Sequence, residues 1–339
     1  MRWTDIIGHE DIINMLQVML KTGRIPHSLL FVGPAGIGKG MVANVLAAAL
    51  LCHDADSRPC GKCLSCAQLE QKVHPDLLVV RPEGRTIKIE QIRAVQHEMS
   101  LAPYTGRYKV CIIEEAETMT KEAANSLLKV LEEPPGDVVF ILVSAARYRL
   151  LQTIISRCRL LSFQPIVCKQ LAEALIAKGF AAEQAKVAAR LSSGRMGTAL
   201  NILLPDGLVL RDMAMEIVRR IPVEGMSLVW DLTARISRLE RNELLALLKF
   251  LTYIFRDILL IAAGQTGEML YNTDLAGELA RQVHYWQDDS IMSVIREIKT
   301  AERAVNGNAN IQLSCEGLLI SMNDVTRGDK NADSGRSTV

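Results

Sequence analysis

The chain has 339 residues, of which 49% are apolar and 23% are charged, and its formal net charge at pH 7 is +1. This length exceeds what one ordinary hydrophobic core accommodates and predicts two or three domains. The near-neutral charge argues against a protein that grips nucleic acid alone through a strong basic field, but it allows a weak contribution within a larger DNA-binding assembly.

We expect neither a secretion signal nor a membrane span. The first residues, MRWTDIIGHE, are charged from the second position, unlike a secretory signal. The longest apolar stretch begins at Leu244 and is interrupted by Lys249, Arg256 and Asp257. It predicts a buried helix, because a membrane span needs about 20 uninterrupted apolar residues. A cytoplasmic protein with reduced cysteines is therefore expected.

The first half of the chain alternates strand and helix patterns. The apolar run SLLFV (28–32) predicts a strand, and the Ala- and Leu-rich stretch 41–52 predicts a helix. Further strands are predicted at 76–80, 109–115 and 137–144, and helices at 89–101 and 121–133. This alternation predicts an α/β fold, a parallel sheet with helices on both faces. Strands buried on both sides read as continuous apolar runs, as these do.

Only helical periodicity remains after residue 165. We predict an α/β domain at 1–165, a small helical domain at 166–206, a larger all-α domain at 207–325 and a disordered polar tail at 326–339.

Residues 33–40, GPAGIGKG, match the phosphate-loop pattern G-x-x-x-x-G-K-[ST] except at the last position. Backbone N–H groups of such a loop cradle phosphates, the lysine reaches the β and γ phosphates, and a final Ser or Thr helps hold Mg²⁺. Gly40 lacks that hydroxyl. ATP or ADP could still be held by the loop, or the loop could bind nucleotide poorly. The candidate nucleotide-binding residues are Gly33, Gly36, Gly38, Lys39 and Gly40.

Glu114 and Glu115 end the predicted strand at 109–115. A nucleotidase normally places Asp then Glu here, the first for Mg²⁺ and the second to activate water. Glu114 is one methylene too long for that shell, whereas Glu115 could act as a base. Gly40 and Glu114 both weaken metal binding, which favours lost hydrolysis over an unusual working site. A solvated strand end is the alternative.

Four cysteines predict a metal site: Cys52, Cys60, Cys63 and Cys66. Their spacing, C-x₇-C-x₂-C-x₂-C, suits a tetrahedral zinc ion, and four thiolates leave no position for water, so the site would be structural. Free thiols, disulfides and an iron–sulfur cluster are the alternatives. His53 is a spare ligand candidate, interpreted as a bystander.

Ser156-Arg157-Cys158 follows the last predicted strand. Arg157 would lie at the edge of the sheet domain, where a neighbouring subunit's nucleotide could bind. An arginine supplied in trans stabilises charge on a transferring phosphoryl group. A solvated side chain is the alternative.

Together these residues resemble bacterial DNA polymerase III clamp-loader subunits of the AAA+ superfamily, most closely the delta-prime branch. The resemblance covers nearly the whole chain. It is carried by the glycine loop, the cysteine insertion, NSLLKVLEEPP (125–135) and TIISRC (153–158), with NGNANIQLSCEGLLI (306–320) near the end.

The resemblance implies a AAA+ module, a helical lid and a helical collar that joins five subunits in a ring. It implies that Arg157 is an arginine finger for an adjacent motor subunit. The implied partners are gamma/tau and delta subunits, with the sliding clamp and primed DNA reached through the assembly.

Departures from motor subunits point to a subunit that does not hydrolyse ATP. Besides Gly40 and Glu114, Gly197 stands where the lid carries a sensor arginine, and Arg195 lies two residues away. The sensor segment, Ser144-Ala145, has one hydroxyl instead of two. An active gamma/tau-like motor, supported by Lys39 and Glu115, is the rival interpretation.

Overall fold

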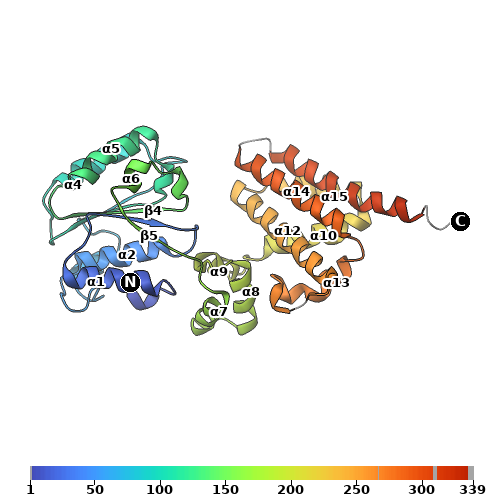
Figure 1. Cartoon of the computed structure of the whole chain (residues 1–339), viewed down its shortest axis with the longest axis horizontal. Helices are drawn as coiled ribbons and strands as arrows, with labels where there is room; N and C mark the ends of the chain where they lie inside the picture. The colour runs from blue at the N-terminus through green and yellow to red at the C-terminus, as the bar shows by residue number, and fades with distance from the viewer. Residues whose placement is uncertain (1, 266, 308–310, 335–339) are drawn as a thin grey trace. The chain divides into compact units, whose positions relative to one another are not determined.

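The computed structural model describes residues 2–265, 267–307 and 311–334, and its described residues include a five-stranded parallel sheet (Figure 1). The strand order is β2-β3-β4-β1-β5. The strands are β1 (Ser28–Val32), β2 (Leu77–Val80), β3 (Lys109–Ile113), β4 (Val138–Ser144) and β5 (Arg159–Ser162). The four predicted strands are confirmed. Strand β5 was not predicted, because its four residues bury only Leu161 and so lack a continuous apolar run.

Helices cover both faces of the sheet, which confirms the predicted α/β layering (Figure 1). Leu29 and Phe31 of β1 pack on the side of α1–α3, whereas Leu30 and Val32 pack on the side of α4–α6. Successive strand residues face opposite layers, so every residue of β1 is buried. The six helices are α1 (Glu10–Thr22), α2 (Lys39–Leu51), α3 (Leu64–Glu70), α4 (Ile89–Ser100), α5 (Lys121–Glu132) and α6 (Gln152–Ile155).

The helices beside the candidate sites have clear start and stop signals. The Thr120 hydroxyl caps α5 by accepting the Ala123 N–H at 3.2 Å. Helix α5 ends at Glu132, two residues before Pro134, which could not continue it. Helix α2 begins directly after Gly38, so the glycine loop leads straight into its first turn.

The second half is helical. Three short helices come first: α7 (Cys168–Ala177), α8 (Ala182–Leu191) and α9 (Met196–Ile202). A larger group follows, with one apolar core: α10 (Val209–Glu224), α11 (Met226–Ile236), α12 (Arg241–Ala262), α13 (Ala276–Gln282), α14 (Asp288–Asn306) and α15 (Ile311–Ser334). The buried helix predicted from Leu244 is α12. None of the described helices has the length and apolarity needed to cross a membrane.

The tail expected to be disordered differs from the structure in part. Helix α15 continues to Ser334, so residues 326–334 are helical, and 335–339 lie outside the described residues. By its internal contacts the chain forms two compact units, residues 1–182 with 192–200, and residues 183–191 with 201–339. The three-domain division stays a prediction.

Candidate functional site

The four predicted metal ligands lie together. The Sγ atoms of Cys52, Cys60, Cys63 and Cys66 are all within 4.8 Å of one another, and the Cys52–Cys63 and Cys60–Cys66 pairs are 3.9 and 4.0 Å apart. Ligands about 2.3 Å from a tetrahedral zinc ion would be about 3.8 Å apart. A disulfide would need about 2.05 Å, and all four thiols are free. The cluster therefore fits a metal ion. His53 is outside the group.

The cysteines lie at helix ends and in the turn between them. Cys52 directly follows α2, and Cys63 is the N-cap of α3, where its Sγ accepts the Cys66 N–H at 3.5 Å. Cys60 Sγ accepts the Cys63 N–H at 3.4 Å. Backbone N–H donation from Lys62 and Cys63 lowers the pKa of Cys60 to about 6, whereas burial raises the pKa of Cys66 to about 12. The turn thus favours the thiolate, the metal-binding form, at Cys60.

A buried polar chain ties the cysteine module to the sheet. The Ser65 hydroxyl in α3 donates to the Leu51 carbonyl at 2.7 Å and lies 2.9 Å from His74 Nε2. His74 Nδ1 accepts the Asp76 N–H at 3.1 Å, and the Asp76 carboxylate accepts the Thr105 N–H at 2.8 Å. Burial lowers the pKa of His74, consistent with a neutral ring protonated at Nε2.

The glycine loop lines a cavity of about 440 Å³. Lys39, the first residue of α2, is 6% exposed, and its Nζ donates to the carbonyls of Gly33 at 2.5 Å and Pro34 at 2.8 Å. Burial lowers the pKa of Lys39, and the negative charge of Glu117 opposes that shift. The lysine therefore binds its own loop in this structure.

Gly40 and Glu114, the two residues whose identities predicted a weakened metal shell, both line this cavity. A Cβ built on Gly40 meets nothing within 4 Å, so a side chain would fit there but none is present. Arg81, just after β2, binds the Glu114 carboxylate through Nε at 2.8 Å and Nη2 at 3.3 Å. Glu115 is exposed at the cavity wall and has a left-handed backbone, with φ of 50°.

The start of α9 packs directly on the glycine loop. The Gly197 N–H donates to the Gly36 carbonyl at 2.8 Å, and a Cβ at Gly197 would lie 3.1 Å from the same oxygen. Arg195 instead donates from Nε to the Ser192 carbonyl at 2.9 Å. Gly197, which was predicted to stand in place of a sensor arginine, thus contacts the loop through its backbone.

Glu117 is a cavity residue that sequence reasoning missed. Its Oε1 accepts the Ala145 N–H at 2.9 Å, just after β4, and its Oε2 is buried without a hydrogen-bond partner. The Ser144 hydroxyl accepts the Ala146 N–H at 3.1 Å, so its oxygen is hydrogen-bonded to the backbone two residues further along. A carboxylate therefore contacts the segment where sensor hydroxyls were expected.

Arg157 lies at the opposite edge of the sheet from the glycine loop. The Ser28 hydroxyl, at the start of β1, donates to the Arg157 carbonyl at 2.7 Å, whereas the loop follows Val32 at the end of β1. Four strand steps of about 3.3 Å separate the two ends by roughly 13 Å. The structure thus groups Lys39 with Glu114 and Glu115 around one cavity and leaves Arg157 apart from them.

Two partners of the predicted residues were also missed, although the sequence holds signals for both. Arg81 follows the predicted strand 76–80, and Val80 pairs with Ile113, which brings Arg81 beside Glu114. Glu132, in the NSLLKVLEEPP stretch, forms an ion pair with Arg157.

Comparisons with known proteins extend these observations. Residues 8–167 match the family model described as DNA polymerase III, delta subunit. The chain is similar to DNA polymerase III subunit delta' of Bacillus subtilis, with 29% identity over 317 residues, covering 92% of this chain and 95% of that protein. The Pseudomonas aeruginosa subunit delta' is 44% identical over 135 residues, covering 39% of this chain and 41% of that protein. Subunit tau of Escherichia coli is 38% identical over 157 residues, but these cover 46% of this chain and 24% of that protein.

Proposed function

The chain belongs to the delta'-like clamp-loader subunits of DNA polymerase III, and on that premise we propose that it does not hydrolyse ATP but supplies Arg157 to a neighbouring motor subunit. The observation that carries this proposal is the position of Arg157 at the sheet edge away from its own glycine loop. An arginine placed there is available to another subunit's nucleotide and not to its own.

The state of its own loop supports the lack of hydrolysis. Gly40 offers no hydroxyl to Mg²⁺, and the Glu114 carboxylate is bound by Arg81. Gly197 offers no guanidinium to a phosphate. Glu115 remains, but a base without a positioned metal and nucleotide has no water to activate.

The partners are proposed from the family. We infer assembly with gamma/tau motor subunits and a delta subunit in a five-membered ring, which loads the sliding clamp onto primed DNA during replication in the cytoplasm. The similarity to subunits named delta', tau and gamma supports this assembly. Residues 207–325 are proposed as the collar and 166–206 as the lid.

We further propose that the cysteine cluster holds a structural zinc ion. Cys52, Cys60, Cys63 and Cys66 would each supply one sulfur, and no ligand position would remain for water. The ion would fix the segment between α2 and α3, and zinc bound this way carries out no chemistry on a substrate.

A second candidate is a subunit that holds ATP or ADP without turnover. The cavity of about 440 Å³ beside the glycine loop favours it. Nucleotide would have to draw Lys39 away from the carbonyls of Gly33 and Pro34, since the ammonium now donates to both.

Two measurements test these proposals. Mg·ATP binding and turnover are measured on the purified chain, with Lys39→Ala as the blank. We expect no turnover; turnover that the Lys39 variant loses would make the chain a motor subunit, and binding without turnover would favour the second candidate.

The second measurement is the ATPase rate of the assembled clamp loader containing Arg157→Ala. We expect the rate to fall, whereas Arg159→Ala, an exposed arginine two residues away, leaves it unchanged. A normal rate with Arg157→Ala would refute the arginine-finger assignment.

A further inference from the structure

The side chain of Arg157 is tied to its own subunit. Its Nη2 forms an ion pair with Glu132 Oε1, and its Nη1 donates to the Thr153 carbonyl at 3.0 Å and to the Ser156 hydroxyl at 3.4 Å. Both terminal nitrogens of the guanidinium are thus occupied by groups of the same chain. These are the nitrogens that a fork-like contact to a phosphate uses.

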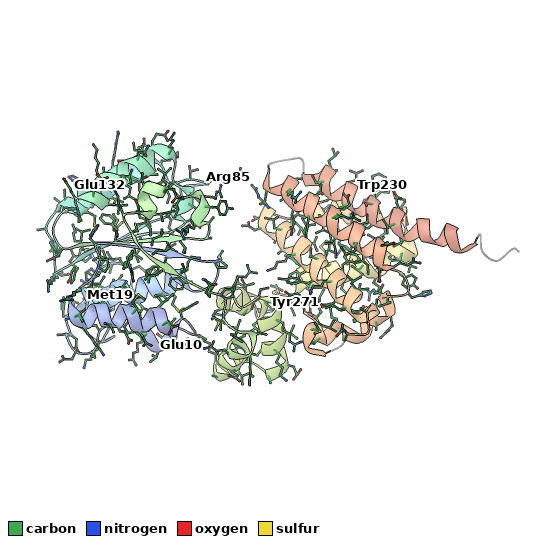
Figure 2. All side chains as sticks on the ribbon, viewed as in Figure 1. Glu10, Met19, Arg85, Glu132, Trp230 and Tyr271 are labelled. Carbon is green, nitrogen blue, oxygen red and sulfur yellow. The ribbon has the colours of Figure 1, made fainter. Side chains whose placement is uncertain are left out.

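The backbones on both sides of this pair are fixed. The Arg157 carbonyl accepts from Ser28 on β1, and the Arg157 N–H donates to the Ile154 carbonyl at 3.1 Å. Glu132 is the last residue of α5 and is labelled in Figure 2. One residue earlier, the Leu131 carbonyl lies 3.1 Å from His27 Nε2. Separation of the pair therefore requires side-chain rotation and no movement of the sheet.

The pair is only partly shielded from water. The Arg157 side chain is 34% exposed and that of Glu132 is 49% exposed. Such a pair breaks easily in water, since exposed ion pairs are weak. It nevertheless neutralises the arginine, and the carboxylate would repel an incoming phosphate, because both carry negative charge.

We propose that Glu132 is a positioning residue that holds Arg157 folded back onto its own subunit until a neighbour's nucleotide displaces it. This inference rests on the proposed arginine-finger function. Engagement exchanges one acceptor for another: the guanidinium leaves the Glu132 carboxylate and binds phosphoryl oxygens of a nucleotide in the adjacent subunit. Glu132 thereby sets how readily the finger engages before DNA and the clamp have closed the assembly.

The variant for the test is Glu132→Gln, which keeps the size of the side chain and removes its charge. The matched control is Glu133→Gln, the same change at the next residue, which is also exposed. A general loss of charge or a weaker helix end would affect both variants, whereas release of Arg157 would affect only the first.

The first experiment uses the purified full chain without partners. Arginine modification by phenylglyoxal is followed by mass spectrometry, with exposed Arg159 as the internal reference. Because the ion pair is a weak restraint, we expect Arg157 in Glu132→Gln to react about two- to fivefold faster than in the parent chain. Glu133→Gln should match the parent. Equal Arg157 rates in all three proteins would overturn the proposal and leave the arginine-finger assignment untouched.

The second experiment measures ATP hydrolysis by the assembled loader with and without primed DNA and clamp. With Glu132→Gln we expect the rate without DNA to rise about two- to fivefold and the DNA-stimulated rate to change less, so the stimulation ratio falls. An unchanged ratio, or a lower rate without DNA, would refute a restraining role. If Arg157→Ala has no effect in the same assay, the proposed function itself has failed, and that result is separate from the reactivity result on the free chain.

Discussion

The two ends of helix α2 differ in how complete their chemistry is. At its C-terminal end, Cys52 joins three other sulfurs in a set that matches a tetrahedral ion. At its N-terminal end, Lys39 binds its own loop, and Gly40 offers no metal ligand. A metal centre depends on every ligand, whereas a loop can keep its shape through packing and hydrogen bonds alone. The cysteine cluster at one end of α2 thus fits a bound ion, whereas at the other end the Lys39 ammonium is hydrogen-bonded to its own loop.

Removing one sulfur from the cysteine cluster should have the largest effect on the stability of the chain. Cys63→Ser leaves three thiolates, so we expect bound zinc to be lost. Because metal binding energy is also folding energy, the free energy of unfolding should fall by about 3 kcal/mol or more. Metal analysis and chemical denaturation measure the two effects. Cys168→Ser, an exposed cysteine outside the cluster, is the control. One zinc ion per chain in Cys63→Ser would contradict the four-ligand site.

Substituting Ala for two glycines beside the glycine loop, Gly40 in α2 and Gly197 in α9, should change the free energy of unfolding in opposite directions. Gly197→Ala places a Cβ 3.1 Å from the Gly36 carbonyl, so we expect a loss of about 1 kcal/mol in the free energy of unfolding. Gly40→Ala meets nothing within 4 Å in a helix, so we expect a gain of about 0.5 kcal/mol. Thermal and chemical denaturation compare the two. If Gly197→Ala stabilises the chain, the close contact between Gly197 of α9 and the Gly36 carbonyl does not contribute to the stability of the loop.

Mild acid should lower the free energy of unfolding through His74, which contacts Ser65 beside the cysteine cluster, at a pH above that at which carboxylates are protonated. Burial lowers the pKa of His74, so below about pH 6.5 the unfolded chain takes up a proton that the folded chain resists. The stability contributed by neutral His74 is full above that pH and is lost as the pH falls toward the lowered value. Denaturation between pH 7.5 and 5.5, with zinc content monitored, should show this slope.

The control for that slope is a pair of substitutions. His74→Gln should flatten it, since the proton uptake disappears, and His97→Gln should leave it unchanged, because His97 is exposed on α4. If stability falls with pH as steeply in His74→Gln as in the parent chain, groups other than His74 cause the pH dependence.

The smallest effect is expected from the ion pair beside the cavity. Arg81 is 63% exposed, so Glu114→Gln should change the free energy of unfolding by less than about 1 kcal/mol. Salt should reduce even that difference, because exposed charges are screened. A larger loss in the free energy of unfolding would mean that the Arg81–Glu114 ion pair contributes to folding as strongly as the cysteine cluster does.

The spacing of residues in the sequence predicted the cysteine cluster at the C-terminal end of α2 better than it predicted the contacts around the cavity at the N-terminal end. The four cysteines fall within fifteen residues, so the short segment from the end of α2 to the start of α3 is enough to bring them together. The bond from Arg81 to Glu114 joins residues 33 positions apart and depends on the register of β2 and β3. That register was beyond what apolar runs alone specify.

Side-chain orientation was the second limit on prediction. The glycine pattern located Lys39, but only the structure shows its ammonium bonded to the loop carbonyls of Gly33 and Pro34. Likewise, Glu117 was indistinguishable from a solvated residue in the sequence until its contact with Ala145 became visible. Rotamers of polar side chains are chosen by partners that lie far along the chain.

The chain passes between its two compact units three times, after residues 182, 191 and 200. A single proteolytic cut therefore cannot separate the two units cleanly, because a cut after residue 200 leaves residues 183–191 with the first unit and a cut after residue 182 leaves residues 192–200 with the second. A fragment that stops at residue 182 would lack Gly197, whose N–H holds the Gly36 carbonyl, and Gly194, whose carbonyl accepts the Ile166 N–H. A fragment intended to fold as the sheet-containing unit should thus extend to at least residue 200, so that it includes residues 192–200, which belong to that unit although they follow a segment of the other.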